Sequence, residues 1–113
     1  MIRDREFGVI MGTYTNKKVK IYVDDIRPVP EGYIGTKSVN ETIALIRQIE
    51  ADGGEIALLD LDHDLGDYAK DGGDAIKILD YLVEHETLYP VALHTMNPVG
   101  AENMRRVIRR YWP

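Results

Sequence analysis

Residues 56–64 read Ile56-Ala57-Leu58-Leu59-Asp60-Leu61-Asp62-His63-Asp64, an apolar run that ends in acidic residues and a histidine. Four consecutive apolar residues are typical of a strand that is buried on both faces, as in a parallel sheet. Three more β-rich segments are found at residues 19–23, 33–36 and 90–93. The chain is therefore expected to contain four short strands, and residues 56–64 hold the densest group of reactive side chains.

Helical patterns separate most of these strands. Ser38 is a favourable N-cap, and Glu41 follows it at the spacing of a capping box. A second helix is expected after Asp74, which can cap it, and a third from about Gly100 to Arg110. Strands that alternate with helices predict an α/β domain with a mostly parallel sheet.

Size and composition limit the possible functions. The chain has 113 residues, a net charge of −5 and no cysteine, so we expect one domain without disulfides or Cys-ligated metal. The negative charge argues against a broad nucleic-acid-binding surface. No apolar stretch approaches the ~18 residues of a membrane span, and no signal segment follows Met1. These features predict a cytoplasmic protein without a membrane partner, and they leave its oligomeric state open.

The domain itself is expected to cover residues 19–113. Residues 1–18 are then an N-terminal extension, and residues 7–14 within it contain β-forming side chains. An extra edge strand and a partly ordered tail fit this segment equally well.

Carboxylates follow two of the expected strands. Asp24 and Asp25 come directly after residues 19–23, and Asp62 comes near the end of the quoted run. Ligands of open parallel sheets bind beyond the carboxyl ends of the strands. The three carboxylates are therefore candidates to hold Mg²⁺ or Mn²⁺, which prefer oxygen ligands. The alternative is that Asp24 and Asp25 are solvated turn residues with Arg27 as a local partner.

Two histidines also lie at strand ends. His63 is flanked by Asp62 and Asp64, and His94 follows residues 90–93. Because imidazole titrates near neutral pH, one ring can remove a proton while the other protonates a leaving oxygen. We therefore expect the two rings to lie close enough to share one phosphate, with Asp62 at the same catalytic centre. The alternative for His94 is a half-buried structural side chain.

Several further side chains are candidates for substrate binding. Thr95 and Asn97 can hold phosphate oxygens together with N–H groups at the start of the last helix, and the alternative for Asn97 is a helix cap. Asp64 can orient the His63 ring. Asn103 and Arg106 are secondary candidates for an anion contact. The full set is Arg27, Asp64, Thr95, Asn97, Asn103 and Arg106.

Two other polar residues are assigned no chemical role. Asp60 lies further back in its strand, where an apolar residue would be easier to bury. His85 lies late in an amphipathic helix beside Glu84 and Glu86, where a surface position near the helix C-terminus is expected.

Part of the chain resembles a response-regulator receiver domain. The resemblance rests on Lys20-Ile21-Tyr22-Val23-Asp24-Asp25, on the apolar strand before Asp62 and on Thr95, and it covers roughly residues 19–110. It implies a flavodoxin-like three-layer sandwich with Mg²⁺ held by the three carboxylates. Two parts of a full receiver have no counterpart. Residues 26–30 replace the first helix, and the last strand–helix unit with its lysine is missing before Pro113.

A more specific resemblance is to the cyclic-phosphate processing receiver domain family. It rests on three motifs in order: Asp24-Asp25-Ile26-Arg27-Pro28, Leu61-Asp62-His63-Asp64-Leu65-Gly66, and His94-Thr95-Met96-Asn97-Pro98-Val99-Gly100, with Asn103-Met104 beyond. This resemblance implies a role in processing cyclic phosphate ends, such as 2′,3′-cyclic phosphates, in RNA repair or phage–host conflict. The implied partner is a nucleotide or an RNA terminus that carries a cyclic phosphate.

Two functions follow from these residues. The first is a metal-assisted phosphoesterase, a hydrolase in which Asp24, Asp25 and Asp62 hold the metal while His63 and His94 exchange protons. The second is a receiver-like module that binds Mg²⁺ and a nucleotide or protein partner without turnover. The histidine pair favours the enzyme, because a scaffold has no evident need for it.

Overall fold

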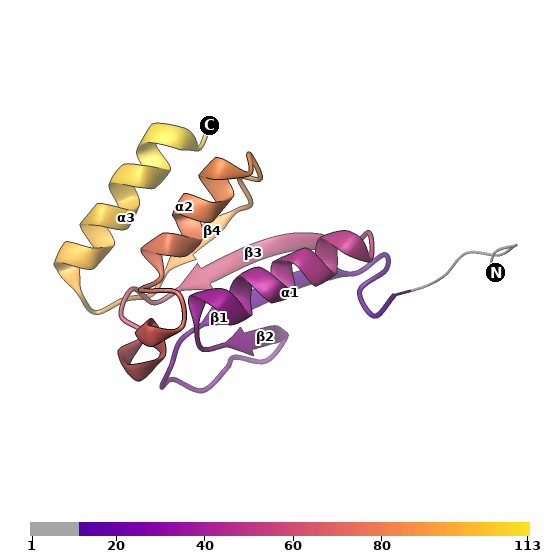
Figure 1. Cartoon of the computed structure of the whole chain (residues 1–113), viewed down its shortest axis with the longest axis horizontal. Helices are drawn as coiled ribbons and strands as arrows, with labels where there is room; N and C mark the ends of the chain where they lie inside the picture. The colour runs from indigo at the N-terminus through magenta and orange to yellow at the C-terminus, as the bar shows by residue number, and fades with distance from the viewer. Residues whose placement is uncertain (1–11) are drawn as a thin grey trace, which may run out of the picture.

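The computed structural model describes residues 12–113, so most of the extra edge strand predicted within residues 7–14 lies outside the described part. Figure 1 shows a four-stranded sheet with three α-helices. In chain order the elements are β1 (Lys18–Val23), β2 (Tyr33–Thr36), α1 (Val39–Ala51), β3 (Glu55–Leu61), the 3₁₀ helix η1 (Gly66–Lys70), α2 (Ile76–Glu84), β4 (Val91–Leu93) and α3 (Pro98–Tyr111). None of the described helices has the length and apolar character needed to cross a bilayer.

All strand pairs in the sheet are parallel. The order across the sheet is β2-β1-β3-β4, with Ile21 of β1 opposite Ile34 of β2 and Leu59 of β3. Leu61 pairs with Leu93 of β4. The carboxyl ends of the strands therefore lie along one edge, and the predicted receiver-like α/β fold is confirmed.

The helices cover a single face of the sheet. The connections from β2 to β3 and from β3 to β4 lead toward the β4 edge of the sheet. The connection from β1 to β2 leads toward the opposite edge. Since crossovers between parallel strands are right-handed, a helix joining β1 to β2 would lie on the face opposite α1 and α2. Residues 24–32 make that connection without a helix. Of the three layers in the complete fold, the described residues thus form two, the sheet and one helical layer.

The hydrophobic core lies between the sheet and this helical layer. Side chains alternate along a strand, so one face of the sheet supplies apolar residues to the core. The largest fully buried side chains of the core are Ile21, Val23, Leu59 and Leu61 of the sheet, Val39, Ile46 and Ile49 of α1, Leu65 of the loop after β3, Ile78, Leu79 and Leu82 of α2, and Met104 of α3. The residues between them in β1 and β3, such as Tyr22 and Asp60, lie on the other face.

Helix starts were predicted with mixed success. Ser38 caps α1 as predicted, because its hydroxyl accepts a hydrogen bond from the Glu41 N–H at 3.1 Å. Asp74 does not cap α2; its carboxylate instead accepts the Leu65 N–H at 3.2 Å. The last helix begins earlier than predicted, with Asn97 as its N-cap and Pro98 in its first turn, a position that suits proline because the missing N–H needs no partner there.

The Ser38 cap gives a stability prediction. Its hydroxyl also donates to the Asp71 carboxylate at 2.7 Å, and the residue is only 2% exposed. We expect Ser38→Ala to lower the free energy of unfolding by about 1 kcal/mol, as is typical when a helix cap is lost. Urea unfolding measures the change, with Lys77→Ala on an exposed position of α2 as the control. An unchanged unfolding midpoint in Ser38→Ala would contradict this assignment of the cap.

Candidate functional site

Three predicted site residues meet at the carboxyl edge of the sheet. The ladder continues one residue beyond the strands, because the Asp62 N–H donates to the Val23 carbonyl at 2.9 Å and the His94 N–H donates to the Leu61 carbonyl at 3.0 Å. Asp24, Asp62 and His94 each point one ligand atom into a common space, and these atoms lie within 4.8 Å of one another. We call these three residues the edge cluster.

Asp24 is the buried carboxylate of the edge cluster. Its side chain is 1% exposed, and one oxygen accepts hydrogen bonds from the backbone N–H groups of Ile26 and Arg27, both at 2.9 Å. Burial raises the pKa of Asp24, but these two hydrogen bonds and the nearby His94 ring outweigh it, so the net shift of the pKa is downward. The protein therefore holds Asp24 as a carboxylate at neutral pH.

His94 lies between two carboxylates. Its Nε2 is 2.9 Å from an Asp24 oxygen, and its Nδ1 is 2.7 Å from an oxygen of Asp60. The ring also stacks on Tyr22, with 4.3 Å between ring centroids and 5° between planes. These contacts fix both the position and the tilt of the imidazole.

Asp60 is a site residue that sequence reasoning missed. It belongs to β3 and points to the face without helices, where it holds His94. Its sequence signal was the two-residue spacing from Asp62, which places both side chains on one face of the strand. Recognising that no helix covers this face would have removed the objection to burying a carboxylate there.

The contacts of His94 with Asp24 and Asp60 leave two possible states of the site. A neutral imidazole carries one N–H, so it donates to only one of the two carboxylates. The second nitrogen then faces a carboxylate oxygen with neither group carrying a proton. Either the ring is an imidazolium that donates to both Asp24 and Asp60, or a cation lies between Nε2 and Asp24. A carboxylate that holds the far nitrogen of a metal-binding histidine is a common arrangement.

Arg27 lies beside the edge cluster, as its predicted substrate-binding role requires. Its guanidinium donates to the His94 carbonyl at 2.6 Å and lies 3.7 Å from an Asp24 oxygen. A pocket of about 360 Å³ opens next to it, lined by Asp24, Arg27, Val29, Tyr33, Gly35, Thr36, Lys37 and Glu41. We call this space the Tyr33 pocket.

Asp25 lies apart from the edge cluster. Its carboxylate is near the backbone of Gly66, where an added Cβ would come within 2.5 Å of the Asp25 oxygen. Adjacent residues that leave a strand point in opposite directions, so Asp24 and Asp25 diverge. The structure therefore brings together two of the three predicted metal-binding carboxylates, Asp24 and Asp62, with His94 in place of the third.

His63 and His94 do not share one space, contrary to the expectation from sequence. His63 lies against the first turn of α3, where a Cβ on Gly100 would come within 2.5 Å of the ring. That turn belongs to the helical layer, because Met104 of α3 is in the core. His94 lies on the opposite face against Tyr22. The reason is again alternation, since His63 is one residue beyond Asp62.

A second group of polar residues surrounds His63. Its Nδ1 lies 2.7 Å from an Asp64 oxygen, and this hydrogen bond is the main reason that the pKa of Asp64 is lowered. Asn97 donates to both Asp64 oxygens at 3.1 and 3.3 Å while its own oxygen accepts the Gly100 N–H. Thr95 accepts the Asn97 N–H at 3.1 Å. These predicted phosphate-binding groups thus connect the end of β3 to the start of α3.

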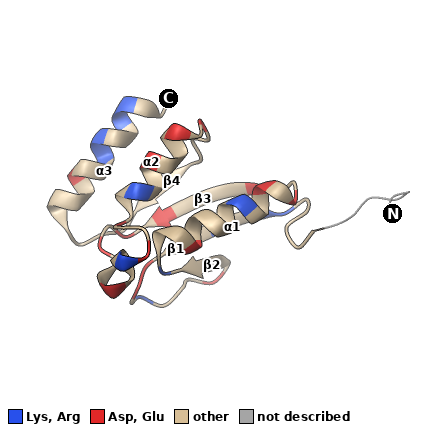
Figure 2. Cartoon of the chain, in the orientation of Figure 1, with Lys and Arg blue, Asp and Glu red and all other residues tan. Residues whose placement is uncertain are grey.

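The two secondary candidates lie on α3. Asn103 is exposed, and Arg106 lies 3.9 Å from Glu102 with its side chain 70% exposed. Figure 2 shows the basic residues of α3 toward its C-terminal half, away from the end that meets the sheet edge. Arg105 and Arg109 pair with Glu102 as well. Asn103 and Arg106 therefore lie apart from the edge cluster.

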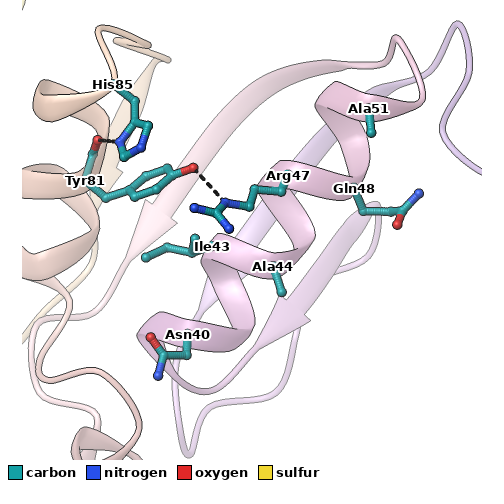
Figure 3. A pocket seen from close by; sticks show the side chains of 8 residues that line it. All are labelled: Asn40, Ile43, Ala44, Arg47, Gln48, Ala51, Tyr81 and His85. Atoms are coloured by element: carbon teal, nitrogen blue, oxygen red, sulfur yellow. Dashed lines mark hydrogen bonds between the residues drawn. The ribbon is translucent and has the colours of Figure 1, made fainter.

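A separate pocket of about 730 Å³ lies between α1 and α2 (Figure 3). Arg47 donates to the Tyr81 hydroxyl at 3.3 Å, and His85 stacks on the same ring. The full lining is Asn40, Ile43, Ala44, Arg47, Gln48, Ala51, Tyr81 and His85. Because this lining contains no carboxylate and lies away from the strand ends, it does not supply the chemistry of the edge cluster.

Comparison with protein families gives one match. The family model described as the cyclic-phosphate processing Receiver domain matches residues 19–110. The matched range covers the sheet from Val19 onward, all three helices up to Arg110 and every candidate site residue. Neither the curated proteins nor the solved structures provide a match.

The lowered pKa of Asp24 gives a pH prediction. A carboxylate whose pKa is lowered by folding stabilises the protein above its unfolded value of about 3.9, and that stability is lost as the pH falls through the folded value. We expect Asp24→Asn to lower the free energy of unfolding at pH 7 by about 1.5–3 kcal/mol, as for hydrogen bonds to charged groups. The difference from the unchanged protein should shrink below pH ~3.9.

Urea unfolding at pH 7 and at pH 3 checks this prediction. Asp67→Asn is the matched control, since Asp67 is an exposed carboxylate of η1. A loss of stability in Asp24→Asn that is equal at both pH values would show that the charge of Asp24 is not what stabilises the fold.

Proposed function

Because the chain belongs to the cyclic-phosphate processing receiver domain family, we propose that it is a metal-assisted phosphoesterase. Its substrate is a cyclic phosphate on a nucleotide or on an RNA end. The single observation that carries this proposal is the edge cluster, in which His94 lies within 4.8 Å of two carboxylates at the carboxyl ends of the strands. Open α/β sheets bind their ligands at this edge.

The donor set of the edge cluster suits a divalent cation. Asp24 and Asp62 would provide carboxylate oxygens, which Mg²⁺ and Mn²⁺ prefer, while His94 beside them keeps its Nε2 proton for the reaction. A cation held there would polarise the phosphoryl group and offset its negative charge.

The chain's own residues supply the remaining chemistry in this proposal. Water forms a new bond to phosphorus, the bond from phosphorus to one ribose oxygen breaks, and that oxygen takes a proton from His94 Nε2. The proton lost by the water restores the imidazolium. Asp60 keeps the ring oriented through Nδ1, and Arg27 neutralises the phosphate beside it.

The group around His63 has a positioning role in the same proposal. Asp64 and Asn97 hold the end of β3 next to the first turn of α3. Thr95 lies between His94 and this turn in the sequence. Its hydroxyl can bind a phosphate oxygen, whereas the Gly100 and Ala101 N–H groups of the turn already donate to Asn97.

One observation favours a second function, binding without turnover. Both nitrogens of His94 already face carboxylates, so the ring has no free position from which to move a proton unless one contact opens. A module that only holds a cation and a nucleotide would need no such opening. The two functions differ in whether product forms.

The activity test compares the three histidines. We expect His94→Ala to lower the rate of cyclic phosphate opening by about 10²–10⁴-fold, the usual contribution of a general acid. His63→Ala should lower it less, because the His63 ring lies on the other face of the sheet. Phosphorus NMR follows the products of 2′,3′- and 3′,5′-cyclic nucleotides with Mg²⁺, Mn²⁺ or EDTA.

His85→Ala is the matched control, because His85 lies at the end of α2 against Tyr81, away from the edge cluster. Equal losses in His63→Ala and His94→Ala would contradict the assignment of the proton transfer to His94 alone. Ligand-induced shifts without product would establish the binding module instead.

The metal test separates the neighbouring aspartates. We expect Asp24→Asn and Asp62→Asn to weaken Mn²⁺ binding about 10-fold or more, since each removes a charged ligand. Asp25→Asn should have a smaller effect, because Asp25 lies against Gly66. Electron paramagnetic resonance of free Mn²⁺ measures the affinities, with Asp67→Asn as the control. If Asp25→Asn weakened Mn²⁺ binding as much as Asp24→Asn, the metal would instead be held by all three carboxylates, Asp24, Asp25 and Asp62.

A further inference from the structure

One face of the sheet is left open by the described residues. The three helices pack on the other face, and residues 24–32 replace the helix that would cover this one. Lys20, Tyr33 and Leu58 share one row across the open face, by the pairing of their strands. Lys20 is exposed, and the other two are partly exposed.

Aromatic rings run along this open face toward the edge cluster. His94 stacks on Tyr22, and Tyr22 meets Tyr33 edge to face with 5.8 Å between centroids. The Lys20 ammonium lies 4.7 Å from the centre of the Tyr33 ring. A track of rings and cations thus extends from the proposed reaction site along β1 and β2.

The Tyr33 pocket lies at the reaction end of this track. Its volume of about 360 Å³ is at the small end of the range for ligand pockets. Tyr33 and Val29 give it apolar walls, while the cations Arg27 and Lys37 share the lining with two carboxylates, Asp24 and Glu41. Gly35 forms part of the lining, and Val29 lies where a Cβ at Gly35 would be.

We propose that this face binds the end of a single-stranded RNA. The nucleoside that carries the cyclic phosphate stacks on Tyr33 in the Tyr33 pocket, and the phosphate of the preceding linkage contacts Lys20. This assignment rests on the proposed function, because it places the cyclic phosphate next to Arg27 and His94. It names an RNA chain, rather than a free cyclic nucleotide, as the preferred substrate.

The chemistry of the face fits that occupant. Bases stack on aromatic side chains whatever their sequence, and lysines follow the backbone phosphates. A 2′,3′-cyclic phosphate requires the 2′-hydroxyl, so the chain that bears one is RNA. The track is narrow and the net charge is −5, which suits an end of a few nucleotides better than a long duplex.

The binding test uses a short RNA that ends in a 3′-phosphate, with EDTA present so that no turnover takes place. We expect amide NMR shifts concentrated in β1, β2 and residues 24–32. Tyr33→Ala should weaken binding by about 5- to 150-fold, the range for loss of one stacked base, while Tyr33→Phe should bind like the unchanged protein. Tyr111→Ala, on the exposed end of α3, is the matched control.

The charge contact is tested by salt dependence. Lys20→Gln should reduce the slope of log affinity against log salt by about 0.7, as expected for one phosphate contact of a single strand. Lys77→Gln on α2 should leave the slope unchanged. Shifts confined to the helical face, or equal affinities of Tyr33→Ala and Tyr33→Phe, would overturn the proposal.

Turnover then separates this proposal from the proposed function. A higher kcat/KM for a cyclic-phosphate-ended RNA than for the matching cyclic mononucleotide, reduced to equality in Tyr33→Ala, would support both. Equal kcat/KM values for the two substrates in the unchanged protein would overturn the RNA track and leave the phosphoesterase intact. Tyr33-dependent RNA binding with no product from either substrate would support the track and contradict the enzyme.

Discussion

The right-handedness of parallel crossovers determines where this protein can place its chemistry. In the strand order β2-β1-β3-β4, the step from β1 to β2 is the only one of the three that runs toward the β2 edge. Its crossover helix would therefore be the one that covers the second face. Residues 24–32 make this connection as a loop, so α1, α2 and α3 all pack on one side. The open face, and the position of the edge cluster on it, both follow from this single replacement.

The open face allows polar side chains within the central strands. Asp60 lies in β3 between two strands, a position where a covering helix would bury a carboxylate at a large cost in free energy. Without that helix, Asp60 keeps contact with solvent and holds His94 at 2.7 Å. Tyr22 and His94 stack on each other beside this contact. The hydrophobic core lies under the helical layer, and the reactive groups lie on the open face of the sheet.

The sequence predicted the elements better than it predicted the site. Periodicity and the Ser38 cap predicted the four strands, α1 and the parallel sheet, because these depend on local patterns and on the alternation of strands with helices. The residues at the strand ends were also identified. Their grouping was not, because alternation sends Asp62 and His63 to opposite faces. Asp60 was set aside because the sequence does not state which face stays open, and Asp74 was assigned to α2 although it caps the loop at Leu65.

The position of His94 connects the protonation of the site to what it binds. With carboxylates on both nitrogens, the ring is either an imidazolium or the partner of a cation, and the change between these states exchanges a proton for a metal. Asp24 remains charged in both, since hydrogen bonds from Ile26 and Arg27 lower its pKa despite burial. Only the imidazolium carries the Nε2 proton that the proposed reaction gives to the leaving oxygen, so the two states differ in whether that step is possible. If Nε2 instead bound a cation, the edge cluster would have no proton donor, because His63 lies on the other face of the sheet.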